Sequence, residues 1–185
     1  MSFRGLLSRI SRNLDSAGVP YMLTGSYASS VHGSPRATQD LDIVIAPTRA
    51  RLLALLELFP DTEYYVSVDA ALDAFASRGQ FNVIDFETGW KVDLILIKDR
   101  DFSRTEFERR RPLQLEDVSV YVASPEDVLL AKLEWSKLGA SARQVEDAAG
   151  IVRLQRENLD VVYVEHWVAV LQVHDQWTDA KARAV

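Results

Sequence analysis

Residues 40–45 read DLDIVI and place two aspartates one residue apart at the start of an apolar run. The alternation predicts a strand on which Asp40 and Asp42 point to one face while Leu41 points into the core. Two carboxylates this close repel each other, and burying either one is costly unless a cation or hydrogen-bond donors compensate for the charge. The stretch therefore predicts a strand whose beginning attracts a cation.

A third aspartate follows on a later strand. Residues 81–97, FNVIDFETGWKVDLILI, alternate on both sides of residues 87–89 and predict a hairpin whose second strand carries Asp93. If that strand lies beside residues 40–45, three carboxylates converge and suit Mg²⁺ or Mn²⁺, which keep waters and take further ligands from phosphates. Two such ions would activate an attacking oxygen and stabilise a leaving pyrophosphate. The alternative is that these carboxylates are solvated or capping groups at strand ends.

A phosphate-binding turn is predicted upstream, where Gly25-Ser26 lies fifteen residues before Asp40, counted from Gly25. Glycine lets the backbone approach a phosphate, and a helix that begins at Ser26 presents free N–H groups and the positive end of its dipole. Arg36 and Thr38 would add a charge and a hydroxyl toward a triphosphate. The alternative is an ordinary Gly-Ser turn.

The remaining patterns predict an α/β (α+β) fold, with a small mixed β-sheet flanked by helices and followed by a C-terminal helical bundle. Residues 1–122 would form a mixed α/β core and residues 123–185 a helical region packed on it, since no linker rich in Gly, Ser or Pro separates them. Apolar spacing and capping residues predict helices over residues 3–17, 26–32, 49–59, 69–77, 125–138, 141–154 and 159–177. Alternation predicts strands over residues 19–24 and 40–46, in the hairpin, and over 113–124, as one strand or a pair.

The composition fits a globular protein, because 48% of its 185 residues are hydrophobic and provide for a core. The absence of cysteine excludes disulfides and thiolate metal sites. No apolar run is long enough to span a membrane, and the amphipathic N-terminus lacks the pattern of a signal peptide, so a cytoplasmic location is expected. A net charge of −6 argues against a basic nucleic-acid coat, although residues 104–112, RTEFERRRP, form a local positive cluster.

Three motifs in this order resemble the nucleotidyltransferase superfamily of the DNA polymerase β type. They are LTGSYA at residues 23–28, DLDIVI at 40–45 and KVDLILI at 91–97. The resemblance implies a small mixed sheet flanked by helices and two divalent ions, Mg²⁺ or Mn²⁺, held by the three aspartates. It also implies transfer of a nucleoside monophosphate from an NTP, such as ATP or CTP, with loss of pyrophosphate.

Within that superfamily, PRATQDLDIVI at residues 35–45 is similar to the R-x-T-x-D-h-D motif of AbiEii-type toxins from toxin–antitoxin pairs. MNT-type antitoxins resemble the chain less, because they tend to carry a Ser where this chain has Gln39. Residues 126–135 and 142–152 are similar to later AbiEii-type motifs, in which a Lys and an Asp face the active site; here they match Lys132 and Asp147.

The two matched residues have plausible chemical roles and plausible structural ones. The Lys132 ammonium would offset charge that develops on the triphosphate. Asp147 would hold that lysine or help to take a proton from the acceptor hydroxyl. Alternatively, Lys132 extends from a core helix to solvent, and Asp147 is one more solvated charge.

Three functions fit these features. The first is a toxin-type enzyme that adds nucleotides to the 3′ end of tRNA, with a cognate antitoxin as a possible partner and residues 9–12 and 104–111 as phosphate contacts. The second transfers a nucleotide to an aminoglycoside or a protein hydroxyl (AMPylation), which suits an acidic protein when the acceptor is a cationic drug. The third is a non-catalytic, antitoxin-like member of the same fold.

Overall fold

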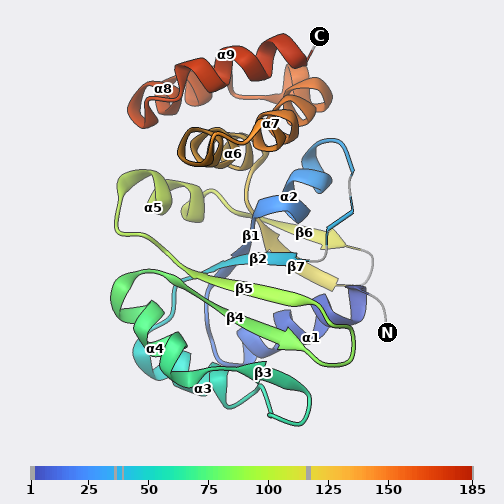
Figure 1. The fold of residues 1–185 in the computed structure, drawn as a ribbon, viewed down its shortest axis with the longest axis vertical. Coiled ribbons are helices and arrows are strands. Elements are labelled where there is room, and N and C mark those ends of the chain that lie inside the picture. Colours follow the sequence, from blue (N-terminus) through green and yellow to red (C-terminus); the bar gives the residue numbers. More distant parts are fainter. Residues whose placement is uncertain (1–2, 36, 39, 116–117, 185) are drawn as a thin grey trace. The chain divides into compact units, whose positions relative to one another are not determined.

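The structure is a computed structural model that describes residues 3–35, 37–38, 40–115 and 118–184. It contains a mixed seven-stranded sheet with the strand order β3-β4-β5-β2-β1-β7-β6 (Figure 1). β2 pairs with β5 in parallel, as β1 does with β7, and the other neighbours are antiparallel. The strands are β1 (Tyr21–Leu23), β2 (Asp40–Ile45), β3 (Tyr64–Val66), β4 (Gln80–Asp85), β5 (Lys91–Leu96), β6 (Arg111–Leu115) and β7 (Val118–Val122).

Helices make up much of the remaining described chain, so the predicted α+β class is confirmed. α1 packs against β7 and α3, while α4 packs along β4 and β5. In the described residues, every helix is too short or too polar to cross a bilayer. The helices are α1 (Phe3–Ser16), α2 (Gly25–His32), α3 (Arg49–Leu56), α4 (Val68–Ser77), α5 (Asp101–Glu108), α6 (Pro125–Gly139), α7 (Ala142–Gln155), the 3₁₀ helix η1 (Arg156–Asn158), α8 (Val161–Leu171) and α9 (His174–Arg183).

Local sequence signals set several of these helix boundaries. Thr48 accepts a hydrogen bond from the backbone N–H of Arg51 and so caps α3, and Ser124 accepts one from the N–H of Asp127 and caps α6. Gly18, with a φ of +62°, follows the end of α1 in the left-handed region that glycine adopts without strain. These boundaries agree with the sequence prediction, apart from α3, which ends three residues before the predicted end.

The prediction of one helix over residues 159–177 is wrong. The chain leaves α8 at Gln172, which adopts a left-handed φ of 57°, and the N–H of Val173 bonds to the carbonyl of Val168. α9 then begins at His174. This is a left-handed helix end without the glycine that usually forms it, so the sequence carries no signal for the break.

By internal packing, the chain divides into two compact units. The first contains Met1–Leu23 and Gln39–Val122, and the second contains Thr24–Thr38 and Ala123–Val185. The segment that holds α2 thus belongs with the C-terminal helices, although it lies between β1 and β2 in sequence. The division into a core over residues 1–122 and a helical region over 123–185 stays a prediction, and the return of α2 to the second unit was not predicted.

Close contacts explain why α2 belongs with the second unit. A Cβ on Gly33 would lie 2.9 Å from the backbone nitrogen of Ile151, so only glycine lets α2 approach α7 this closely. The ring Nε2 of His32 lies 2.8 Å from the carbonyl oxygen of Ala123, and Gln155 Nε2 donates to the carbonyl of His32 at 2.8 Å. These contacts fix the end of α2 against the C-terminal helices.

Candidate active site

The three predicted carboxylates lie on two adjacent strands of the first unit. β5 runs parallel to β2, with Asp93 paired with Asp42 and Lys91 paired with Asp40. Residues two apart on a strand share a face, and paired positions on parallel neighbours face the same way. The condition set by the sequence, that the strand of Asp93 lie beside residues 40–45, is therefore met.

The three carboxylates differ in their exposure to solvent. Asp40 is exposed and Asp42 is half-buried, whereas only 6% of the Asp93 surface is accessible. Leu41 and Val92, which alternate with them, are fully buried. Asp93 Oδ1 is buried and has no hydrogen-bond partner. A buried carboxylate oxygen without a partner is unfavourable unless a ligand supplies the missing positive charge.

Lys91 completes this group and was not among the predicted site residues. Its Nζ lies 3.0 Å from Asp93 Oδ2 and 3.6 Å from Asp40 Oδ1. The hydrogen bond to Asp93 raises the pKa of Lys91 above the ordinary lysine value, so the amine stays charged at neutral pH. The sequence did contain a signal, because Lys91 precedes Asp93 by two residues and therefore shares its face of the strand.

The donor set suits a divalent metal ion. Asp40, Asp42 and Asp93 offer hard carboxylate oxygens, the ligands that Mg²⁺ and Mn²⁺ prefer, and the buried Asp93 Oδ1 still has acceptor capacity. Within the described residues, no three acidic or histidine side chains already surround a common point as metal ligands. A positive charge of the protein itself, the Lys91 ammonium, lies 3.0 Å from Asp93 Oδ2.

The predicted phosphate-binding turn lies at the start of α2, in the second unit. Gly25 has a φ of +64°, which an L side chain rarely adopts, so glycine is needed at this position. The extended Thr24 precedes the helix without capping it through its side chain. The first N–H groups of a helix have no intrahelical acceptor and attract anions. Ser26 follows within this first turn, Thr38 is half-buried, and the predicted contact from Arg36 lies outside the described residues.

Lys132 and Asp147 face each other between α6 and α7. Lys132 Nζ lies 2.9 Å from Asp147 Oδ2, and the two side chains are only 5% and 8% exposed. Lys132 therefore does not extend to solvent, and Asp147 is not an ordinary solvated charge. The pairing matches the predicted arrangement in which the aspartate holds the lysine, while their catalytic roles stay a prediction.

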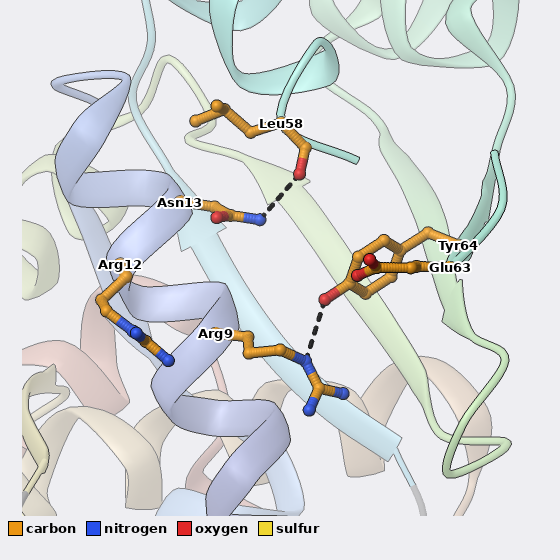
Figure 2. A pocket seen from close by; sticks show the side chains of 6 residues that line it. All are labelled: Arg9, Arg12, Asn13, Leu58, Glu63 and Tyr64. Carbon is orange, nitrogen blue, oxygen red and sulfur yellow. Dashed lines mark hydrogen bonds between the residues drawn. The ribbon is translucent and has the colours of Figure 1, made fainter. Parts of the chain in front are cut away.

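A separate cavity of about 260 Å³ lies in the first unit, and its polar groups bond largely to one another (Figure 2). Arg9 donates from Nε to the Tyr64 hydroxyl at 3.0 Å and forms an ion pair with Asp85 at 2.7 Å. Asn13 donates to the carbonyl of Leu58 at 3.0 Å. These contacts tie α1 to the region of β3. The cavity is lined by Arg9, Arg12, Asn13, Leu58, Glu63 and Tyr64.

Residues 104–111, the second basic region predicted to contact RNA phosphates, are partly neutralised by ion pairs within the protein. Arg104 forms ion pairs with Asp99 and Asp101, the latter at 2.6 Å. The guanidinium of Arg110 stacks over the Phe107 ring, with its central carbon 4.1 Å from the ring centroid. Arg9 is likewise paired, with Asp85 and Glu87. Two of the charges expected to contact RNA phosphates, Arg9 and Arg104, therefore already have carboxylate partners.

No protein-family model matches this chain, and no curated protein sequence matches it. Its fold is similar to that of the antibiotic-resistance factor ANT(2'')-Ia in solution, with 14% identity and a TM-score of 0.58 over 98% of this chain and 97% of that chain. The crystal structure of ANT(2'')-Ia in complex with adenylyl-2''-tobramycin gives 14% identity and 0.59 over 91% and 95%. An antigenic nucleotidyltransferase-like protein from Paracoccidioides brasiliensis gives 18% identity and 0.56 over 96% and 91%.

These likenesses establish the fold. The arrangement of strands and helices is similar to that of ANT(2'')-Ia and of the nucleotidyltransferase-like protein. The narrower likeness to AbiEii-type toxins stays a prediction.

Proposed function

We propose that the protein is a metal-dependent nucleotidyltransferase that moves a nucleoside monophosphate from an NTP to an acceptor hydroxyl. The observation that carries this proposal is the group of carboxylates on β2 and β5. Asp42 and Asp93 are register partners, Asp40 lies two residues before Asp42, and the buried Asp93 Oδ1 lacks a hydrogen-bond partner. A purely structural role does not account for three carboxylates and an unsatisfied buried oxygen on one face.

In this proposal Asp40, Asp42 and Asp93 hold Mg²⁺ or Mn²⁺. When bound, the metal neutralises charge on the triphosphate and lowers the pKa of the acceptor hydroxyl. The backbone N–H groups that begin at Gly25 and the Ser26 hydroxyl bind phosphate oxygens, and Arg36 and Thr38 add to this binding. Asp147 orients Lys132, whose ammonium offsets negative charge developing on the substrate.

The acceptor we favour is a polycationic aminoglycoside. The protein carries a net charge of −6, which attracts amines and repels nucleic acid. Arg9 and Arg104, from the two basic regions considered for RNA, are paired with carboxylates of the same protein. The fold is also shared with ANT(2'')-Ia, whose crystal structure holds adenylyl-2''-tobramycin.

The second candidate acceptor is the 3′ end of tRNA. It is favoured by residues 35–45, PRATQDLDIVI, because this motif is similar to that of AbiEii-type toxins. A toxin of this kind would act with a cognate antitoxin as its partner. Salt dependence separates this acceptor from the drug, because RNA binding weakens steeply as salt displaces phosphate contacts.

A transfer assay with NTPs labelled at the α-phosphate tests both acceptors. The purified protein is incubated with Mg²⁺ and each of the four NTPs, together with an aminoglycoside panel, total tRNA or a mixed protein extract. We expect label on an aminoglycoside with wild type and with Asp61→Asn, an exposed control, and none with Asp42→Asn. Label on tRNA instead would show that the acceptor is tRNA and not an aminoglycoside, and the proposed nucleotidyl transfer would still hold. No Asp42-dependent transfer to any acceptor, with the protein folded, would overturn the proposal.

A further inference from the structure

The carboxylate group on β2 and β5 contains a cation of its own. Lys91 is the register partner of Asp40, and Asp93 is the register partner of Asp42. Since these positions share one face of the sheet, the Lys91 ammonium lies beside Asp40 and Asp93 on the face that Asp42 also shares. Asp93 Oδ1 is buried without a hydrogen-bond partner, so this carboxylate still attracts a cation.

Lys91 satisfies this group only in part. Its Nζ contacts Asp93 Oδ2 at 3.0 Å and Asp40 Oδ1 at 3.6 Å, while Asp93 Oδ1 remains buried without a partner. A divalent ion has twice the charge of an ammonium and accepts several oxygen ligands at short distance. It therefore competes with the ammonium for the same oxygens.

We propose that Lys91 is a tethered cation that occupies part of the metal site and that a divalent ion must displace it in order to bind. The inference rests on the proposed function, because it takes Asp40, Asp42 and Asp93 as the metal ligands. Metal binding then exchanges one cation for another, and the net affinity is lower than bare carboxylates would provide. Lys91 thereby raises the metal concentration at which the site fills.

A cross-strand ion pair that only stabilises the sheet predicts a different result. In either case, removing the ammonium destabilises the metal-free protein, because three carboxylates are left facing one another. A merely structural pair would leave metal affinity unchanged or weaken it along with the fold. A cation that competes for these oxygens predicts lower stability without metal together with tighter metal binding.

The test is a Mn²⁺ titration of the nucleotide-free protein, followed through the electron paramagnetic resonance signal of the free ion. Lys91→Met removes the charge and keeps most of the side-chain volume. We expect it to lower the Kd for Mn²⁺ by about tenfold, because one competing charge at contact distance is gone. We also expect a lower melting temperature without metal, and the difference from wild type to close when Mn²⁺ is saturating.

Three further variants make the outcome specific. Lys98→Met, at an exposed position beyond the end of β5, changes the net charge equally and should barely alter the Kd. Lys91→Arg keeps the charge and should bind Mn²⁺ nearly as wild type does. An unchanged or higher Kd in Lys91→Met, or equal tightening in Lys98→Met, overturns the inference. If Asp42→Asn binds Mn²⁺ as well as wild type does, the proposed metal site itself fails, and this inference fails with it.

Discussion

Two lysine–aspartate contacts, one in each compact unit, have the same chemistry and different surroundings. Lys132 and Asp147 meet at 2.9 Å, and both side chains are enclosed between α6 and α7. Lys91 and Asp93 meet at 3.0 Å, but the lysine side chain is 39% exposed and the same ammonium also lies near Asp40. The two contacts are nearly equal in length, so distance does not distinguish them.

Unsatisfied acceptor capacity does distinguish them. Lys132 and Asp147 are both buried, and removing either one takes a compensating charge away from the other. Asp93, in contrast, contacts Lys91 through Oδ2 and keeps a second buried oxygen, Oδ1, without a hydrogen-bond partner. We therefore interpret the first as a pair that holds a side chain in place, and the second as a site that is prepared for a further cation.

The same change in both contacts gives the largest expected difference. Asp93→Asn should lower kcat/KM for nucleotidyl transfer by about 10³-fold or more, since it removes an anionic ligand at the reacting centre. Asp147→Asn should lower it by about 10–100-fold, as expected of a residue that acts by orienting another. Rates are measured at saturating Mg²⁺ on samples whose circular dichroism matches wild type. If both variants lost the same factor in kcat/KM, the difference proposed between the Lys91–Asp93 and Lys132–Asp147 contacts would be wrong.

Stability should show the opposite order. Lys132→Met should lower the free energy of unfolding by about 3–5 kcal/mol, because the buried Asp147 loses the ammonium that compensates its charge. Lys91→Met should lower it by less than about 1 kcal/mol, because solvent screens this more exposed pair. Urea unfolding at neutral pH, without metal, measures both changes.

A double variant checks the physical reason for that order. Lys132→Met combined with Asp147→Leu should return the stability to within about 1 kcal/mol of wild type, because the uncompensated charge is then absent. If the double variant is as unstable as Lys132→Met alone, packing rather than charge explains the loss.

The smallest effect is expected for an exposed pair on α9. Arg183 Nε lies 2.8 Å from Asp179 Oδ1 along α9, and this hydrogen bond lowers the pKa of Asp179. A carboxyl group with a lowered folded-state pKa adds stability above its ordinary pKa, and that stability is lost as pH falls through the lowered value. Arg183→Gln should thus shift the urea midpoint slightly at pH 7 and not at all in strong acid. A shift as large as that of Lys132→Met would contradict the role given to burial.

The strands of the site were predictable because their signals are local. Alternation in DLDIVI and KVDLILI, and the turn at residues 87–89, predicted β2, β4 and β5. The pairing of Asp42 with Asp93 depends on β5 lying between β2 and β4, which is a long-range choice that alternation does not encode. The contact of Lys91 with Asp40 was not predicted for a related reason, because Asp40 lies on another strand.

Other features that were not predicted from the sequence also have physical explanations. The break between α8 and α9 falls at Gln172, in a left-handed conformation without the glycine or proline that would signal it. β3 has only three residues, including the exposed Tyr65, so it lacks the length that makes an alternating pattern recognisable. The packing of α2 with the C-terminal helices depends on the contact of Gly33 with Ile151, far away in sequence.

The return of α2 to the second unit has a consequence for folding during synthesis. α2 ends at His32, but its packing partners α6 and α7 begin only at Pro125 and Ala142. On the ribosome, α2 emerges long before these partners exist, and a short helix without tertiary contacts is marginal in water. The second unit therefore completes its core late, and a chain that stops at residue 122 would leave α2 without the surface that stabilises it.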